Sequence, residues 1–126
     1  MAFEVQMDEG FVRIELHGRL NDHDLQGVFD VAHAIETTAA VTPHRLTDLT
    51  GVAAVNLNFL TVEKHAARRR VAQLRNGVKS AIVAPEPIHY GYARMFQMLN
   101  TNPQIELRVF RDLASAEAWI QSPVPA

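Results

Sequence analysis

The sequence predicts an α/β fold with elements in the order β-β-α-β-α-β-α-β-α. Three observations carry the prediction: 126 residues suffice for one domain, 48% of them are apolar, and short apolar or alternating segments are separated by longer ones with helical periodicity. This order implies a superhelix of crossover units, with a mostly parallel sheet, one antiparallel edge strand and helices packed on the sheet. We expect a single domain over residues 1–121 and a frayed, proline-containing tail over residues 122–126.

The N-terminal third predicts a hairpin followed by a helix. Apolar and polar residues alternate before and after residues 8–10, as in two strands joined by a tight turn. Asn21 or Asp22 can then cap a helix, whose acidic first turn suits the positive end of the helix dipole. The apolar residues of this helix follow the spacing of one helical face: Leu25, Val28, Phe29, Ala32 and Ile35.

The remainder predicts three units of a strand followed by a helix. The strands are expected over residues 44–49, 78–84 and 105–110, and the helices over residues 59–76, 88–99 and 113–120. Thr50 and Gly51 are expected to turn the chain after the first of these strands. Asn58 is expected to cap the next helix, and Gly77 to close it in a left-handed conformation. The expected core stripe of the helix 88–99 is Ile88, Tyr92, Met95, Phe96, Met98 and Leu99.

Composition and motifs exclude several classes of function. The chain has no cysteine, which excludes thiolate catalysis and cysteine-ligated metals. Its net charge of −2 argues against a nucleic-acid partner, and no apolar run approaches the ~20 residues that span a membrane. The segment MAFEVQMDEG has neither the basic start nor the apolar stretch of a signal peptide, so none is expected. The sequence also has no glycine-rich phosphate loop and no serine nucleophile elbow. We therefore expect a cytoplasmic protein without catalytic residues or a cofactor.

Histidines and acids cluster in the first predicted helix without predicting a metal site. Asp22, His23 and Asp24 are followed by Asp30 and His33. Most of these side chains fall on the face opposite the apolar stripe, and an exposed helix face seldom supplies the convergent ligands and supporting shell that a metal needs. The expectation is a solvated polar face with a helix cap.

Asp48, Tyr90 and Arg94 form the best candidate ligand site. Tyr90 and Arg94 are four residues apart in a predicted helix, where a guanidinium can lie against a phenol ring. That helix follows a strand, and Asp48 lies near the end of the preceding strand. All three are therefore expected at the carboxyl ends of parallel strands, where α/β proteins bind ligands. The alternative is a surface stacking pair and an aspartate that accepts hydrogen bonds from turn amides.

The helix 59–76 carries a candidate interface. Glu63 and Arg70 interrupt its apolar arc two turns apart, near Phe59. One interpretation is a symmetric homodimer in which Glu63 pairs with Arg70 of the second chain. The other is that the stem of Arg70 covers a neighbouring helix of the same chain.

Two segments resemble a known family. Residues 47–60 (TDLTGVAAVNLNFL) resemble the middle strand, loop and helix start of STAS domains, the anti-sigma-factor antagonists. The family pattern is an apolar strand ending in Asp-Leu-Ser/Thr-Gly-Val, then Asp-Ser-Ser/Thr-Gly-Leu. Residues 84–96 and 109–112 resemble small bacterial STAS-like proteins of undefined function, which are grouped by fold with the CRAL-TRIO lipid-transfer domain. The resemblance implies a partner loop that here contains Asn56, Asn58 and Thr61.

The sequence departs from the STAS pattern at the phosphorylated residue. Asn58 stands at the position of the phospho-acceptor serine, and asparagine can cap a helix but cannot be phosphorylated. The leading hypothesis is a non-catalytic STAS-like binding or regulatory domain that recognises a protein partner or a small ligand. The alternative is a carrier of a small molecule or lipid, in which Asp48, Tyr90 and Arg94 hold a polar head.

Overall fold

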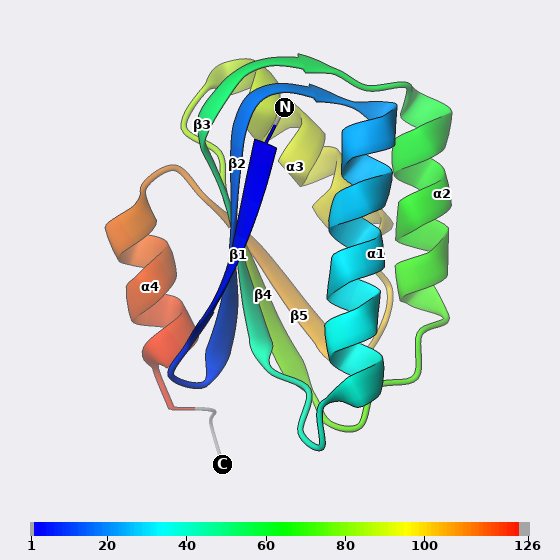
Figure 1. Cartoon of the computed structure of the whole chain (residues 1–126), viewed down its shortest axis with the longest axis vertical. Helices are drawn as coiled ribbons and strands as arrows, with labels where there is room; N and C mark the ends of the chain where they lie inside the picture. The colour runs from blue at the N-terminus through cyan, green and yellow to red at the C-terminus, as the bar shows by residue number, and fades with distance from the viewer. Residues whose placement is uncertain (1, 124–126) are drawn as a thin grey trace.

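The computed structural model describes residues 2–123 and has the predicted α/β order (Figure 1). Its elements are β1 (Ala2–Asp8), β2 (Phe11–Asn21), α1 (Asp22–Thr38), β3 (His44–Asn56), α2 (Phe59–Arg70), β4 (Val78–Val83), α3 (Pro87–Leu99), β5 (Ile105–Phe110) and α4 (Leu113–Gln121). The strands form one sheet in the order β1-β2-β3-β4-β5. Strand β1 runs antiparallel to β2, and the other neighbours are parallel, as predicted.

Helices cover both faces of the sheet. Each parallel strand is added beside the previous one in the same direction, so crossovers of one hand bring α1, α2 and α3 to the same face, while α4 covers the other face (Figure 1). The core under α4 joins Ala116 and Ile120 to Phe11, Leu46 and Ala81 of the sheet. The larger core on the other face draws on β2, β3, α1, α3 and the residue directly after β4: Val12, Ile14, Leu16, Leu20, Val28, Ala32, Leu49, Val52, Ala84 and Ala93.

The predicted helix caps at Asn21 and Asp112 are confirmed. The Asn21 side chain accepts from the backbone N–H of Asp24 at 2.9 Å, and the Asp24 carboxylate accepts from the N–H of Asn21 at 3.3 Å. This reciprocal capping box satisfies two otherwise unpaired donors. At the start of α4, the backbone N–H and the hydroxyl of Ser115 both donate to Asp112 and lower the pKa of its carboxyl.

Strand β3 is longer than the sequence predicts. It continues through Thr50 and Gly51, so the turn expected at these residues is wrong. The pairing of β2 with β3 instead shifts register between Glu15 and His17, which accommodates an extra residue of β3. Asp48 stabilises this bulge, because its Oδ1 accepts from the Thr50 N–H at 2.9 Å and also from the Thr50 hydroxyl.

Helix α2 ends at Arg70, well before the predicted end, and Gly77 lacks the left-handed conformation expected of it. The side chain of Asn102 accounts for the early end. Its Nδ2 donates to the carbonyls of Arg69 and Ala72, at 2.8 and 2.9 Å. These are carbonyls at the helix terminus that would otherwise need other partners. A residue distant in sequence therefore ends the helix, which no local pattern signals.

The buried face of α3 differs from the predicted core stripe. Ile88 and Met98 are 68% and 76% exposed, whereas His89 and Ala93 are buried against the sheet. The helix thus packs through a small residue and a polar one. Its larger side chains flank the contact instead of filling it.

The C-terminal tail is anchored at its start. The Lys79 ammonium donates to the carbonyl and the hydroxyl of Ser122, at 2.7 and 2.9 Å. Ser122 is therefore tied to strand β4 rather than frayed. Residues 124–126 of the predicted frayed tail (122–126) lie outside the described residues.

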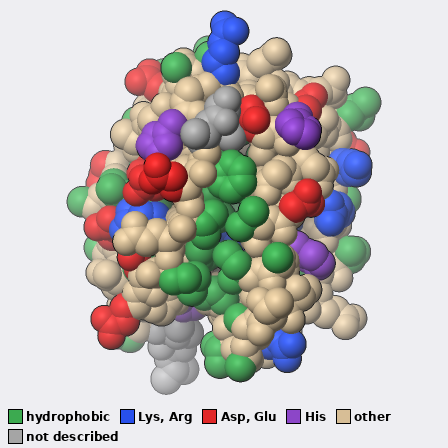
Figure 2. Space-filling model, viewed as in Figure 1, with side chains coloured by type: hydrophobic (Ala, Val, Ile, Leu, Met, Phe, Trp, Pro, Cys, Tyr) green, Lys and Arg blue, Asp and Glu red, His purple; other side chains and the backbone are tan. Residues whose placement is uncertain are grey.

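Apolar side chains are exposed along the edge strand β1. Val5 and Met7 are exposed, and Figure 2 shows hydrophobic side chains gathered near β1 in the middle of this face. No helix within residues 2–123 combines the length and the apolar character needed to cross a membrane.

Candidate ligand cavity

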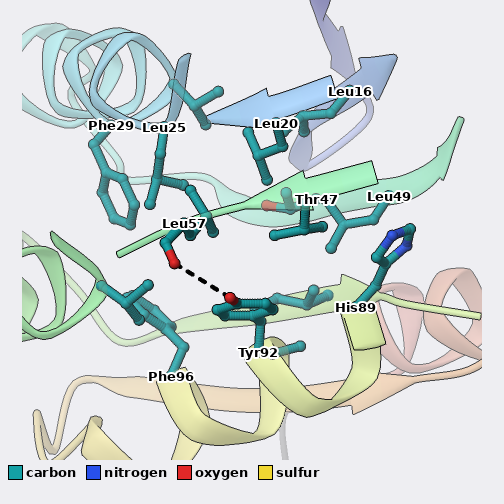
Figure 3. Close-up of a pocket in the computed structure, with 15 residues that line it drawn as sticks. Leu16, Leu20, Leu25, Phe29, Thr47, Leu49, Leu57, His89, Tyr92 and Phe96 are labelled. Atoms are coloured by element: carbon teal, nitrogen blue, oxygen red, sulfur yellow. Dashed lines mark hydrogen bonds between the residues drawn. The ribbon is translucent and has the colours of Figure 1, made fainter. Parts of the chain in front are cut away.

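An apolar cavity of about 100 Å³ lies between the sheet and helices α1, α2 and α3, towards the carboxyl ends of the parallel strands (Figure 3). This is the part of an open α/β sheet at which ligands usually bind. Its walls come from three strands, three helices and the loop before α2: Leu16, Leu20, Leu25, Val28, Phe29, Thr47, Leu49, Val55, Leu57, Val62, Ile82, His89, Tyr92, Ala93 and Phe96.

The cavity is connected to solvent because the helices do not fully cover this face of the sheet. Thr47 remains partly exposed although β3 is the central strand. Leu25, Leu57 and Tyr92, which also line the cavity, are partly exposed as well. A small molecule can therefore reach apolar wall surface, and covering that surface is favourable in water.

Few polar atoms belong to the wall of this cavity. His89 is only 4% exposed, and its Nδ1 has no hydrogen-bond partner. The Tyr92 hydroxyl donates to the carbonyl of Leu57 at 3.2 Å (Figure 3). A buried polar atom without a partner costs free energy, but this nitrogen is enclosed, so it can bond to a hydrogen-bonding group of a ligand only when the His89 ring turns towards the cavity.

An aromatic cluster closes one end of the cavity. The ring of Phe29, which lines the cavity, stacks on the ring of His65 with centroids 4.3 Å apart and planes 3° apart. Phe96 lies 5.8 Å from Phe29 in a tilted arrangement. His65 is 1% exposed, and neither of its ring nitrogens has a hydrogen-bond partner.

The surroundings of His65 favour its neutral form. Burial lowers its pKa, and the positive charges of Arg68 and Lys64 lower it further. The carboxylates of Asp30 and Asp22 act in the opposite direction but do not reverse the shift. The folded state therefore resists protonation at this position at a pH where the unfolded chain accepts a proton.

The protein is expected to lose stability as the pH falls below the ordinary histidine pKa of about 6.5. There the unfolded chain protonates His65 and the folded chain does not, which costs at most about 1.4 kcal/mol per pH unit for one group. His44, whose pKa burial also lowers, adds to the slope. Urea unfolding at pH 7 and pH 5 should show a smaller acid loss for His65→Phe than for the wild type. Equal losses would contradict the assignment of this proton to His65.

The structure does not bring Asp48 together with Tyr90 and Arg94. Thr47 and Leu49, on either side of Asp48, line the cavity beside α3. Because successive side chains of a strand point to opposite faces, Asp48 lies on the face that α4 covers. The expected convergence of the three side chains is therefore not found, and the alternation along β3 is the physical reason.

Tyr90 and Arg94 also differ from the predicted stacking pair. The guanidinium over the Tyr90 ring is that of Arg111, 4.8 Å from the ring centroid. Arg111 also donates to the carbonyl of Pro85 at 3.2 Å. Arg94 instead donates to the side chain of Gln97 on the exposed side of α3. The cation–π contact thus comes from the segment after β5 and not from the same helix.

The expected partner loop lies at the start of α2. The Asn58 side chain caps the helix, as predicted, by accepting from the N–H of Leu60 at 2.8 Å. The backbone N–H of Asn58 donates to Asp22 at 3.0 Å and so ties the loop to the start of α1. Asn56 is exposed at the end of β3, and Thr61 is partly buried in the first turn of α2. Recognition of a partner by these residues stays a prediction.

The charges that interrupt the α2 pattern face solvent. Glu63 and Arg70 are exposed, as is Phe59, while the buried face of the helix carries Val62 and His65. The exposure of Arg70 argues against a stem that covers a neighbouring helix. The homodimer with Glu63 paired to Arg70 of a second chain stays a prediction.

Sequence reasoning missed His89 as a cavity residue. The spacing of His89, Ala93 and Phe96 is that of one helical face, so a pattern existed. A competing stripe that includes Ile88 and Met98 contains larger apolar side chains, so the hydrophobic pattern favours it. Hydrophobicity alone did not identify the face that packs on the sheet.

Comparison with solved structures agrees with this fold. An uncharacterized protein of the DUF3478 family with a SpoIIAA-like fold, from Shewanella loihica PV-4, has a TM-score of 0.57 and 14% identity over 94% of this chain and 92% of that chain. The anti-sigma factor antagonist SpoIIAA in its unphosphorylated form has a TM-score of 0.55 and 18% identity over 94% of both chains. No protein-family model and no curated protein matches the sequence. The chain has a STAS-like α/β fold, and this prediction is confirmed.

Proposed function

We propose that this chain is a non-catalytic STAS-like binding domain whose ligand is a small, mostly apolar molecule with one hydrogen-bonding group. The observation that carries the proposal is the solvent-connected apolar cavity at the carboxyl ends of the strands, lined in part by His89, whose enclosed Nδ1 has no partner. The lack of cysteine and of catalytic motifs supports binding rather than catalysis. In this proposal Asp48 supports the β3 bulge instead of holding the ligand.

The size of the cavity restricts the ligand to a single ring or a short chain. Its volume is about 100 Å³, and an apolar cavity of roughly 150 Å³ is known to take up benzene. Burying roughly 200 Å² of apolar ligand surface contributes about 5 kcal/mol before the cost of association. We therefore expect a dissociation constant no tighter than about 0.2 mM.

Replacing His89 by leucine is expected to raise the free energy of unfolding and to remove the preference for ligands that form a hydrogen bond. The variant loses a buried nitrogen without a partner, so its free energy of unfolding should rise by about 1 kcal/mol. Phenol, which can donate to the imidazole, should stabilise the wild type more than benzene does, and His89→Leu should lose this preference. Thermal unfolding with each probe measures the preference, and urea unfolding measures the stability.

A matched pair of variants tests whether the cavity is the binding site. Leu57→Trp fills the cavity from the loop before α2 and should abolish stabilisation by both probes. Leu60→Trp changes an exposed residue outside the cavity wall and should bind as the wild type does. Native mass spectrometry of protein purified without denaturant reports any ligand that stays bound. Unchanged probe binding in Leu57→Trp would contradict the proposal.

A second candidate function is recognition of a protein partner at the start of α2. Phe59 and Leu60 are exposed large apolar residues directly after the cap Asn58. One structural neighbour is named as an anti-sigma factor antagonist, and the resemblance to the STAS sequence pattern places Asn58 at the position of the phospho-acceptor serine. Co-purification from a cell extract tests this function. If the Phe59→Ser variant co-purifies with the same partner as the wild type does, that partner does not bind at the start of α2.

A further inference from the structure

A second cavity, of about 140 Å³, lies between α1 and the C-terminal part of α2, which run side by side in Figure 1. It shares only Phe29 with the apolar cavity, and its wall is rich in charged groups. The wall residues are Phe29, Ala32, His33, Glu36, Arg45, Arg68, Arg69 and Ala72. Two cavities of different chemistry therefore meet at one aromatic ring.

Positive charge exceeds negative charge in this wall. Arg69 donates to both carboxylate oxygens of Glu36, at 2.6 and 2.8 Å, and Arg45 donates to the same carboxylate. The side chains of all three residues are only 10–12% exposed. Two buried guanidinium groups thus share one carboxylate, which leaves one positive charge without a countercharge. Glu36 is the one carboxylate among the described wall residues, whereas Arg68 adds a third guanidinium at the exposed rim.

The environment of Arg45 is consistent with this excess of charge. Burial and, after it, the positive charge of Arg69 lower the pKa of Arg45 to about 10, although the charge and the hydrogen bond of Glu36 raise it. Arg45 nonetheless remains protonated at neutral pH, because that value lies well above 7. An additional anion would therefore be attracted rather than merely tolerated.

Hydrogen-bond donors are also left over in this wall. Within residues 2–123, Arg45 donates to Glu36 through Nη2 only, and Arg69 through Nη1 only. The other side-chain nitrogens of these two residues have no protein acceptor there, and none of them is among the fully enclosed unpartnered atoms. They therefore have access to the cavity or to solvent. A guanidinium offers five N–H groups in a planar fork, which suits the oxygens of a phosphate or carboxylate group.

We propose that this cavity binds a small oxyanion, a phosphate or carboxylate group, with Arg45 and Arg69 as the buried donors and Arg68 at the rim. This anion site is distinct from the apolar cavity and from the ligand proposed for that cavity. The oxyanion could be free or could be the head of a molecule whose apolar part enters that cavity past Phe29. The same guanidinium groups would recognise the oxyanion in both cases.

Titration with inorganic phosphate at constant ionic strength, balanced with chloride, tests the site by calorimetry. The wild type should bind phosphate, and Arg68→Gln should weaken binding about tenfold, because it removes one charge-assisted hydrogen bond. Arg70→Gln is the matched control: it removes the same charge from an exposed position two residues along α2, outside the cavity wall. This control should bind phosphate within about twofold of the wild type, a difference below 0.5 kcal/mol by the usual conversion.

Two further arms make the outcome decisive. Ala72→Leu fills the cavity without changing its charge and should also abolish phosphate binding. Hexyl phosphate should bind as tightly as inorganic phosphate if the natural oxyanion is a free ion. If one molecule spans both cavities, hexyl phosphate should bind more tightly than inorganic phosphate, and Leu57→Trp should remove this gain in affinity. Absence of phosphate binding to the wild type, or equal losses in Arg68→Gln and Arg70→Gln, would overturn the proposal. Neither result would affect the test with phenol and benzene.

Discussion

Replacing Glu36 by glutamine is expected to lower the free energy of unfolding by about 3 kcal/mol. Glu36 of α1 joins Arg45 of β3 to Arg69 of α2, so one carboxylate links a strand and two helices. Glutamine keeps the shape of the side chain but removes the charge shared by two buried guanidinium groups. Removing one partner of a buried ion pair costs roughly 3–5 kcal/mol, and the adjoining cavity, which can admit water, favours the lower end.

Urea unfolding in chloride buffer without oxyanions measures this effect. Glu63→Gln removes an exposed carboxylate of α2 and should change the unfolding free energy by less than about 0.5 kcal/mol. The double variant Glu36→Gln/Arg45→Met should recover part of the loss, because it also removes one unpaired buried charge. The same unfolding midpoint in Glu36→Gln and Glu63→Gln would contradict the assigned role of Glu36.

The order of strands and helices was predictable because it depends on local periodicity. Strand β5 has the predicted bounds, and α3 begins within one residue of the prediction. The caps at Asn21, Asn58 and Asp112 were predictable for the same reason, since each bonds to a backbone N–H two or three residues away. The STAS-like fold then follows from the order of these elements.

The ends of β3 and α2 were not predictable because distant residues determine them. Asn102, which lies beyond α3, ends α2 by bonding the carbonyl of Arg69 in its last turn and the carbonyl of Ala72 just after it. The β3 bulge depends on the register against β2, which brings His17 beside Gly51. A Cβ on Gly51 would lie 2.5 Å from the His17 ring, so this glycine permits a close approach between strands and not a turn. Local propensity contains no information on either contact.

The relative positions of Asp48, Tyr90 and Arg94 could not be predicted from the sequence, for a topological reason. Alternation along β3 shows that Asp48 and Leu49 face opposite sides, but both sides of the sheet are covered by helices. Which helices cover which side depends on the path of the whole chain. Similarly, the shared carboxylate of Glu36 could not be inferred, because its partner Arg69 is 33 residues away in sequence. Both cavities consist of contacts of this long-range kind.

Replacing Lys79 by methionine is expected to lower the free energy of unfolding by about 3 kcal/mol and to loosen α4. Lys79 is 5% exposed, and its ammonium donates to the Trp119 carbonyl at 2.9 Å as well as to the carbonyl and hydroxyl of Ser122. These acceptors lie at the C-terminal end of α4, where the helix dipole favours a positive charge. Hydrogen bonds to a charged group contribute about 1.5–3 kcal/mol each. Methionine keeps the apolar stem and removes all three bonds, but it also removes the cost of burying an ammonium group, which leaves a net loss of about 3 kcal/mol.

The exposed residue Lys64 of α2 provides the control for this prediction. Lys64→Met should change the unfolding free energy by less than about 0.5 kcal/mol. Relative to the wild type, Lys79→Met should accelerate amide hydrogen exchange more in α4 than in the sheet, because α4 loses its anchor. Ala116 and Ile120 keep their apolar contacts with the sheet in this variant. Unchanged α4 exchange, with a stability equal to that of Lys64→Met, would mean that the lysine does not anchor the helix. The buried cation would then be tolerated by local hydration and not stabilised by the carbonyls around it.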